Sequence, residues 1–111
     1  MNHRTTLFAA MALSVTAWTS LNAADIKESY DKSCAACHGK DGAGATPMGK
    51  KLQIRDFTDA KVQASMKDAD MIKAIMEGVK EGDKSRMKGY GDKLTAEETK
   101  SLVAYIRSLK K

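Results

Sequence analysis

Apolar residues recur at helical spacing in four stretches of the chain, and two long polar segments separate these stretches. Residues three or four positions apart lie on one face of a helix, so this spacing predicts amphipathic helices rather than strands. The expected helices run from Asp25 to about Cys37, from Thr58 or Asp59 to Met66, from Asp68 to the glycines Gly78 and Gly82, and from Thr95 to about Leu109. The pattern therefore predicts an all-α protein.

Capping signals mark the starts of the first and last of these helices. Asp25 is followed three residues later by Glu28, and Thr95 is followed at the same distance by Glu98. An N-cap acceptor with Glu three residues on is the pattern of a capping box. We therefore expect Asp25 and Thr95 to be N-caps.

Three apolar stripes should face the core. The stripes are Ile26 and Tyr30; Ile72, Ile75, Met76 and Val79; and Leu102, Tyr105, Ile106 and Leu109. Because Tyr30 and Tyr105 stand on the first and last stripes, we expect these two rings to join the first and last helices. Between the helices, Gly39 to Asp56, which contains the only proline, and Lys80 to Lys93 are expected to be loops.

The N-terminus has the composition of a secretory signal. Arg4 precedes a short apolar run from Leu7 to Trp18, and small residues follow up to Ala23 and Ala24. A run of roughly twelve apolar residues matches a signal core and falls short of the about twenty that cross a bilayer. We expect a cleaved signal at residues 1–23 and one domain at residues 24–111, with an uncleaved anchor as the alternative.

The composition suggests that something other than side chains fills the middle of the protein. The chain has 111 residues and a formal net charge of +5, which falls to +4 without Arg4 of the signal. Its basic residues are scattered among 14 acidic ones, which makes nucleic-acid binding a weak interpretation. After the signal, only Tyr30, Phe57, Tyr90 and Tyr105 are aromatic, and so short a chain usually needs a staple or a cofactor.

Both cysteines and one of the two histidines fall within five residues, as Cys34, Cys37 and His38. A disulfide across so short a loop would stabilise little, and a thioredoxin-like redox pair needs a βαβ scaffold that the pattern does not predict. A zinc site would need further ligands, and the other histidine lies in the signal. The spacing C-x-x-C-H instead indicates covalent haem attachment through two thiols, with His38 as an axial ligand of the iron.

Four segments together carry a family resemblance. They read CAACHGKDGAG, TPMGKKL, MKGYGDKLTAEE and LVAYIRSL, and they span about residues 25 to 109. In these segments the chain resembles a small bacterial class I c-type cytochrome, a single-haem electron carrier of the periplasm. The resemblance implies a cytochrome c-like fold, with about four short helices wrapped around one covalently attached haem c and its iron.

A methionine is expected as the second axial ligand of the iron. Met48 and Met87 lie in the expected loops, and Met48 is close in sequence to His38. The other candidates fall in expected helices, where methionine usually fills the core: Met66, Met71 and Met76. Met87 matches the family's axial methionine, although Lys88 stands where many relatives have proline.

The resemblance also implies a partner for the axial histidine. A ligating histidine normally donates its second ring N–H to an acceptor, and the family pattern assigns this acceptor to the carbonyl of Pro47. A plain stiff turn at Pro47 is the alternative. Donors for the haem propionates lie in the right segments, but the sequence does not rank them: Lys50, Lys51, Gln53, Arg55 and Tyr90.

The expected function is that of an electron-transfer protein rather than an enzyme. It would carry single electrons in the periplasm between respiratory donors and acceptors, as a monomer that binds redox proteins and no small-molecule substrate or nucleic acid. Basic residues beside Met87 suggest partners with acidic docking faces. The alternative is a haem protein with an open sixth site, acting as a gas-binding sensor or a peroxidase-like catalyst; a docked subunit of a larger oxidoreductase is a variant of the carrier.

Overall fold

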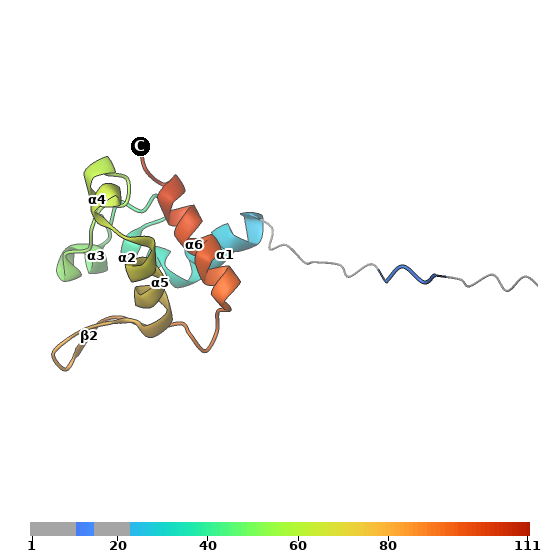
Figure 1. Ribbon diagram of the computed structural model, residues 1–111. Helices are drawn as coiled ribbons and strands as arrows, with labels where there is room; N and C mark the ends of the chain where they lie inside the picture. The colour runs from blue at the N-terminus through green and yellow to red at the C-terminus, as the bar shows by residue number, and fades with distance from the viewer. Residues whose placement is uncertain (1–10, 15–22) are drawn as a thin grey trace, which may run out of the picture.

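The computed structural model describes residues 11–14 and 23–111 (Figure 1). In this part of the chain, six helices and a two-stranded antiparallel sheet follow one another. The elements are α1 (Ala23–Ser33), α2 (Ala35–His38), α3 (Pro47–Leu52), α4 (Ala60–Ser65), α5 (Asp68–Glu77), β1 (Val79–Glu81), β2 (Lys84–Met87) and α6 (Ala96–Ser108). The mostly helical architecture agrees with the all-α expectation, with more helices than the four expected.

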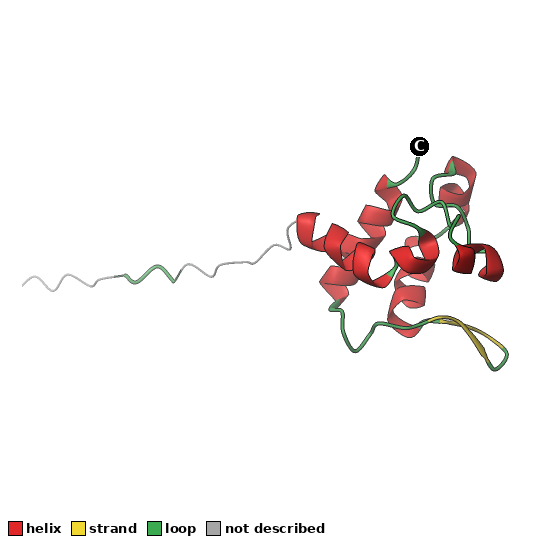
Figure 2. Cartoon of the chain, turned by 180° about the vertical axis from the view of Figure 1, so that it is seen from behind, coloured by secondary structure: helices red, strands yellow, loops and turns green. Residues whose placement is uncertain are grey.

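The first and last helices form the centre of the fold. α6 packs against both α1 and α5, and α3 packs against α2, while the β1–β2 hairpin extends away from the helices (Figures 1 and 2). The core side chains come from α1, α2, α5, α6 and the segment before α4: Ile26, Tyr30, Ala35, Phe57, Met71, Ile75, Leu102, Val103 and Ile106. The core is small because every helix is short.

The last helix follows its sequence signals closely. The Thr95 hydroxyl accepts a hydrogen bond from the Glu98 amide at 3.1 Å, which confirms this residue as the N-cap. Leu102 and Ile106 are buried as expected, and Tyr105 packs against the core from a partly buried position. The ring of Tyr105 lies 5.0 Å from that of Tyr30, so the predicted contact between the first and last helices is confirmed.

The first expected helix is divided in two. α1 begins at Ala23, so the expectation of Asp25 as its N-cap is wrong; Asp25 instead lies in the first turn, where a negative charge favours the helix dipole. Glu28 pairs with Lys32 at 2.7 Å rather than closing a capping box. The break falls at Cys34, whose φ of −118° departs from helical geometry, and the chain re-enters a helix at Ala35.

The segment between Gly39 and Asp56 contains a helix that we expected to be loop. α3 begins at Pro47, directly after Thr46, whose hydroxyl accepts from the Gly49 amide at 2.9 Å. Threonine as N-cap followed by proline at the first helical position is a recognised start signal. The four glycines of the segment and its polar character outweighed that signal in the sequence interpretation.

α4 and α5 have the expected places with small shifts. Asp59 is the N-cap of α4, as one of the two expected alternatives, whereas Asp68 is the first residue of α5 rather than its cap. The expected stripe on α5 is wrong at Val79, which is 40% exposed. Gly78 ends the helix with a φ of 80°, so Val79 enters β1 instead of continuing the helical face.

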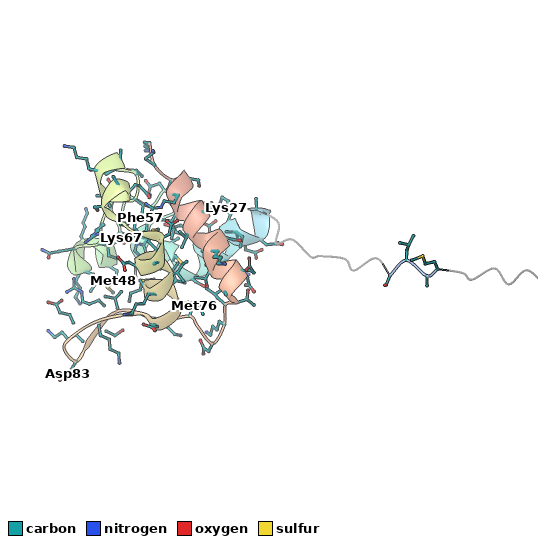
Figure 3. The ribbon with its side chains drawn as sticks, in the orientation of Figure 1. Lys27, Met48, Phe57, Lys67, Met76 and Asp83 are labelled. Carbon is teal, nitrogen blue, oxygen red and sulfur yellow. The ribbon has the colours of Figure 1, made fainter. Side chains whose placement is uncertain are left out.

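The segment from Lys80 to Lys93 is also not wholly a loop. β1 pairs with β2 in antiparallel register, with Val79 opposite Met87 and Glu81 opposite Lys84. The turn between the strands includes Gly82 and Asp83, and Figure 3 shows Asp83 at the outer end of the hairpin, away from the helices. The seven residues of the two strands, three of them basic and one acidic, do not carry the apolar alternation of a half-buried strand, so the pattern could not predict this hairpin.

Most of the expected signal falls on residues 1–10 and 15–22, which lie outside the described residues. Cleavage of the signal therefore stays a prediction. In the ranges that the structure describes, no helix combines the length and the apolar character needed to cross a membrane.

Candidate functional site

A cavity of about 460 Å³ lies among α1, α2, the end of α3, α5, the hairpin and α6. Its lining includes Cys34, Cys37, His38 and Met87, four of the site residues that the sequence predicts. These residues come from segments far apart in the chain, since a long stretch with three helices separates His38 from Met87. The volume lies in the range of small-molecule and cofactor sites.

The three residues of the cysteine–histidine motif are held on one helical turn. The His38 amide donates to the Cys34 carbonyl at 2.9 Å, and the Cys37 amide donates to the same oxygen at 3.3 Å. Side chains three and four positions apart then stand on the same side of the backbone. This geometry explains how Cys34, Cys37 and His38 all reach one cavity.

The chain beyond His38 folds back to satisfy the end of this turn. The Gly44 amide donates to the His38 carbonyl at 2.8 Å, and the Thr46 hydroxyl donates to the Cys37 carbonyl at 2.6 Å. α3 approaches so closely that a Cβ on Gly49 would lie 2.7 Å from the Cys37 carbonyl oxygen. Thr46 and Gly49 thus fix the backbone of the motif from the side of α3.

The His38 ring is placed by burial and by an aromatic neighbour. It stacks on the Phe57 ring, with 4.8 Å between the ring centres and 16° between the planes. Burial lowers the pKa of His38, so the imidazole is neutral at neutral pH, as a metal ligand must be. Its Nδ1 atom is buried and has no hydrogen-bond partner in the described part of the chain.

Both cysteines are free and partly buried. Burial, with a smaller contribution from Cys37, raises the pKa of the Cys34 thiol to about 11. Reactive redox cysteines have lowered pKa values, because their chemistry needs the thiolate. The environment of Cys34 therefore does not favour the thioredoxin-like alternative.

The five methionines outside the signal separate into two groups. Met48 is 44% exposed, and the Met76 sulfur accepts a hydrogen bond from the Thr99 hydroxyl at 3.1 Å; neither lines the cavity. Three line it: Met66, Met71 and Met87. Met71 is a buried core residue of α5, as its helical position predicts, whereas Met87 is at the end of β2 and is only partly buried.

The predicted contact of Pro47 is not made in this structure. The hydrogen-bond partner expected for His38 is the Pro47 carbonyl, but the buried Nδ1 atom has no partner. The role of Pro47 as an acceptor for His38 therefore stays a prediction. Pro47 does act locally as the first residue of α3.

The candidates for propionate binding are now divided by position. Gln53, Arg55 and Tyr90 line the cavity, while Lys50 and Lys51 do not. The Tyr90 hydroxyl donates to the Ser33 carbonyl at 3.1 Å, next to Cys34. The two lysines lie in the last turn of α3, exposed to solvent.

Two contacts at the cavity were not predicted from the sequence, one made by Phe57 and one by Arg86, which the sequence suggested only as a basic residue of the docking face. Phe57 stacks on His38, although nothing in its spacing from the motif predicts this contact; only its rarity as an aromatic could have drawn attention. Arg86 precedes Met87 and lines the cavity as well. The Arg86 side chain donates a hydrogen bond to the carbonyl of Leu52 on α3, which lies 34 residues away in the chain, so no local pattern predicts this contact.

The charged residues that line the cavity are mostly basic. They are Arg55, Lys67, Asp70, Arg86 and Lys88. Four cations and one anion around a cavity mouth attract negative groups, whether on a ligand or on a protein partner. Arg55 and Lys67, which come from other segments of the chain, thus join the basic residues that were expected beside Met87.

Comparison with known proteins identifies the family. A model of the family Cytochrome c matches residues 23–110, which is nearly all of the described chain. The chain belongs to the cytochrome c family. The expected resemblance to a small class I c-type cytochrome is confirmed, and with it the predicted cytochrome c-like fold.

Individual relatives agree with this assignment. Cytochrome c-553 of Helicobacter pylori is 33% identical over 102 residues, which cover 90% of this chain and 95% of the relative. Among solved structures, the KustC0563 c-type cytochrome is 40% identical with a TM-score of 0.68, covering 77% of this chain and 96% of its own. A mutant of the same protein is 38% identical with a TM-score of 0.67, covering 78% and 99%.

Members of this family bind covalent haem c and its iron, and the residues of this cytochrome fit that group. The cavity has a largely apolar lining, two free thiols on one helical turn, and a neutral imidazole with an unpartnered buried nitrogen. An unpartnered buried polar atom calls for a specific explanation, and a bound cofactor that orders this site supplies one. The cytochrome is therefore a haem protein of electron transfer.

Proposed function

We propose that this cytochrome is a single-electron carrier of the periplasm, with haem c attached to Cys34 and Cys37 and with His38 and Met87 as axial ligands of the iron. It would move electrons between respiratory donors and acceptors without acting on a substrate. The observation that carries the proposal is that His38 and Met87 line one cavity together with both cysteines.

The ligand pair suits an electron carrier. When bound, haem c supplies an iron that alternates between two oxidation states and so carries one electron. A thioether is a soft, neutral ligand, and histidine–methionine coordination raises the reduction potential. Met87 would also close the position that oxygen or peroxide would need in a sensor or catalyst.

The surroundings of His38 support its part in this proposal. Its ring is neutral and stacked on Phe57. In the turn that carries it, the carbonyls of Cys34, Cys37 and His38 accept hydrogen bonds. We further propose that the Pro47 carbonyl accepts the His38 Nδ1–H in the haem-loaded protein, because a ligating imidazole usually has such an acceptor. Proton chemical shifts of the Nδ1–H in the reduced haem protein would show whether it is bonded.

The cavity rim supports redox partners with acidic docking faces. The charged residues of the lining are exposed or partly exposed, and we call them the rim: the basic Arg55, Lys67, Arg86 and Lys88 and the acidic Asp70. Complementary charge speeds the encounter of two proteins and orients it. We propose that partners approach at this rim, which borders the cavity that would hold the haem.

The proposed place of action depends on residues 1–23. Their charged start, apolar run and small residues are those of a secretory signal. Mass spectrometry of the protein from a periplasmic fraction would give its N-terminus. A mass that begins at Ala24 or Asp25 supports export, and a full-length chain in the membrane fraction supports the uncleaved anchor.

Absorption spectra of the haem-loaded protein test the axial ligands. We expect a low-spin spectrum with a sulfur–iron charge-transfer band, unchanged by carbon monoxide. Met87→Leu should abolish the band and allow carbon monoxide to bind, since leucine keeps the volume and removes the sulfur. Met66→Leu, which also changes a methionine of the cavity lining, is the matched control and should keep the band.

The same spectra distinguish the proposed carrier from the alternative, a haem protein with an open sixth site. Ready binding of carbon monoxide by the unmodified protein would mean an open sixth site and would favour the sensor or catalyst. Loss of the band in Met66→Leu but not in Met87→Leu would transfer the ligand role to Met66.

A further inference from the structure

The backbone on the C-terminal side of Met87 is anchored to α5. The Tyr90 amide donates to the Ile75 carbonyl at 2.8 Å, and the Gly91 amide donates to the Met76 carbonyl at 2.9 Å. Gly89 crosses so close to the end of α5 that a Cβ there would lie 2.8 Å from the Glu77 carbonyl oxygen. Three contacts of the main chain therefore fix the segment that follows Met87.

The backbone on the N-terminal side of Met87 is paired with β1 but makes no backbone hydrogen bond to a helix in the described part of the chain. All of β1 is exposed, as are Lys84 and Ser85 of β2. A segment with few buried contacts opens at low free-energy cost. In the described part of the chain, the hydrogen bonds that we find from Val79–Met87 to the helices come from the side chain of Arg86.

Arg86 joins the hairpin to α3 and braces it internally. One guanidinium nitrogen, Nη2, donates to the Leu52 carbonyl at 2.5 Å, and the other, Nη1, lies 3.0 Å from a carboxylate oxygen of Glu81 on β1. The Arg86 side chain is 36% exposed and that of Glu81 is 73% exposed, so the ion pair is screened and weak. The bond to the Leu52 carbonyl is the one that links two elements.

The Leu52 carbonyl is a suitable acceptor. Leu52 is the last residue of α3, and the carbonyls of a final helical turn have no partner within the helix. A cationic side chain commonly satisfies such carbonyls. Because Leu52 and Arg86 both line the cavity, their hydrogen bond spans its edge directly beside Met87.

We propose that Arg86 is the positioning residue for Met87: its hydrogen bond to the Leu52 carbonyl holds the N-terminal side of Met87 at the cavity, as the α5 contacts hold the other side. This inference rests on the proposed function, in which the Met87 sulfur binds the iron. Without the bond, the hairpin moves away from α3 more often, and the sulfur leaves the iron more often.

The binding of imidazole to the oxidised haem protein measures how often the Met87 sulfur leaves the iron. Added imidazole competes with Met87, so its apparent affinity rises with the fraction of molecules in which the sulfur has left. A hydrogen bond from a charged donor contributes enough to change such a fraction by about tenfold. We expect Arg86→Leu to bind imidazole about tenfold more tightly than the unmodified protein.

Two further variants test whether the loss of the Arg86 hydrogen bond is what changes imidazole binding. Arg86→Lys keeps the charge and a donor, so it should restore part of the native behaviour. Lys84→Leu removes a cation from the same strand that is exposed and does not line the cavity, and it should bind imidazole as the unmodified protein does. Far-UV circular dichroism of each variant confirms that the helices are formed.

Several results would overturn the inference. Unchanged imidazole binding in Arg86→Leu would do so, as would an equal effect in Lys84→Leu. A changed reduction potential with unchanged imidazole binding would make Arg86 a partner of a haem carboxylate instead. Met87→Leu separates the two proposals: if it leaves imidazole binding unchanged, Met87 is not the ligand and the proposed function fails first.

Discussion

Phe57 is the residue that most affects the orientation of His38 without being part of the haem-attachment motif. The Phe57 ring is buried and lies nearly parallel to the imidazole. The backbone of Phe57 is also held, because its amide donates to the Gly42 carbonyl and its carbonyl accepts from the Gln63 side chain. An aromatic stack of this kind restricts the imidazole to one plane. The position of Phe57 in the chain gives no hint of this contact.

We predict that Phe57→Ala lowers the free energy of unfolding by roughly 3 kcal/mol, the usual cost of deleting a buried phenylalanine. Urea unfolding of the haem-loaded protein provides the measurement. Tyr90→Phe is a suitable control, because it removes only the partly exposed hydroxyl that donates to Ser33. A loss below about 1 kcal/mol in Phe57→Ala would mean that the ring is poorly packed.

A pH dependence is expected at Asp56. Hydrogen bonds from the Thr58 hydroxyl and amide hold the pKa of the Asp56 carboxyl below its ordinary value of 3.8. A carboxyl with a lowered pKa in the folded state stabilises the protein above its unfolded pKa, and this contribution is lost as the pH falls through the folded pKa. The stability gap between the native protein and Asp56→Asn should therefore narrow in acid.

Unfolding at a series of pH values from neutral to about 3 tests this expectation. The unmodified protein should be the more stable form at neutral pH and should approach Asp56→Asn at the acid end. A gap that stays constant over the whole range would show that the carboxylate charge plays no part. Asp83→Asn, at the exposed end of the hairpin, is the control.

At the scale of elements, two glycines make a matched pair. Gly49 lies where α3 crosses the Cys37 and Gly44 carbonyls, and a Cβ there has no room. Gly82 lies at the hairpin turn with a φ of 60°, and a Cβ there meets no atom within 4 Å. A side chain at Gly49 is excluded by neighbouring backbone, whereas a side chain at Gly82 is disfavoured only by the left-handed backbone conformation of that residue.

We predict that Gly49→Ala destabilises the protein severely, whereas Gly82→Ala costs about 1 kcal/mol for its left-handed backbone. In Gly49→Ala, α3 must move away from α2, and the haem-attachment turn loses its support. Thermal unfolding followed by circular dichroism compares the two variants. Similar melting temperatures for both would contradict the close approach of α3 and α2.

The contact between α4 and α6 depends on a buried polar side chain. The Gln63 amide donates to the Phe57 carbonyl at 2.7 Å and to the Ile106 carbonyl at 2.9 Å. Arg107 on α6 in turn donates to the Met66 carbonyl at 2.6 Å and to Asp68 at 2.8 Å. These bonds connect α6 to both α4 and α5.

We predict that Gln63→Leu lowers the free energy of unfolding by about 2 kcal/mol or more. The Phe57 carbonyl loses its donor, the Ile106 carbonyl keeps only the Leu109 amide, and Arg107 loses the Gln63 side-chain oxygen as an acceptor. Urea unfolding of the haem protein measures the loss. Lys61→Leu, which places a leucine at an exposed position of the same helix that does not line the cavity, controls for the added apolar side chain. An unchanged stability in Gln63→Leu would mean that water replaces the amide.

For the whole molecule, the distribution of charge matters more than its total. The net charge of +5 is modest, yet the charged lining of the cavity is four basic residues to one acidic residue. Fields around such an opening steer a partner of opposite charge and weaken as salt is added. The tertiary structure gathers Arg55, Lys67, Arg86 and Lys88 from separate segments.

We predict that electron transfer to an acidic redox partner slows as ionic strength rises, and that Lys67→Gln lowers both the rate at low salt and the salt dependence. Stopped-flow kinetics at several salt concentrations provide the measurement. Lys61→Gln removes an exposed charge that is not at the cavity and should change neither quantity much. A rate that does not fall with salt would count against docking at this rim.

The sequence alone determined the class of the protein and the chemistry of its attachment site. Cys34, Cys37 and His38 occupy one helical turn, so their side chains converge because of local geometry that the spacing already contains. The same holds for the Thr95 cap and for the stripe on α6. Local signals were weaker at α3, where polar composition hid a Thr–Pro helix start, and at the hairpin, whose strands are too short and too exposed to show a period.

The tertiary structure decided what comes together over long stretches of chain. Phe57 against His38, Arg86 against Leu52 and the shared cavity of His38 and Met87 all join residues whose separation along the chain carries no period or motif. Such contacts arise because short amphipathic helices must bury their apolar faces against one another. The packing of α1, α5 and α6 then determines which loops border the cavity, and so which of their side chains can reach the haem.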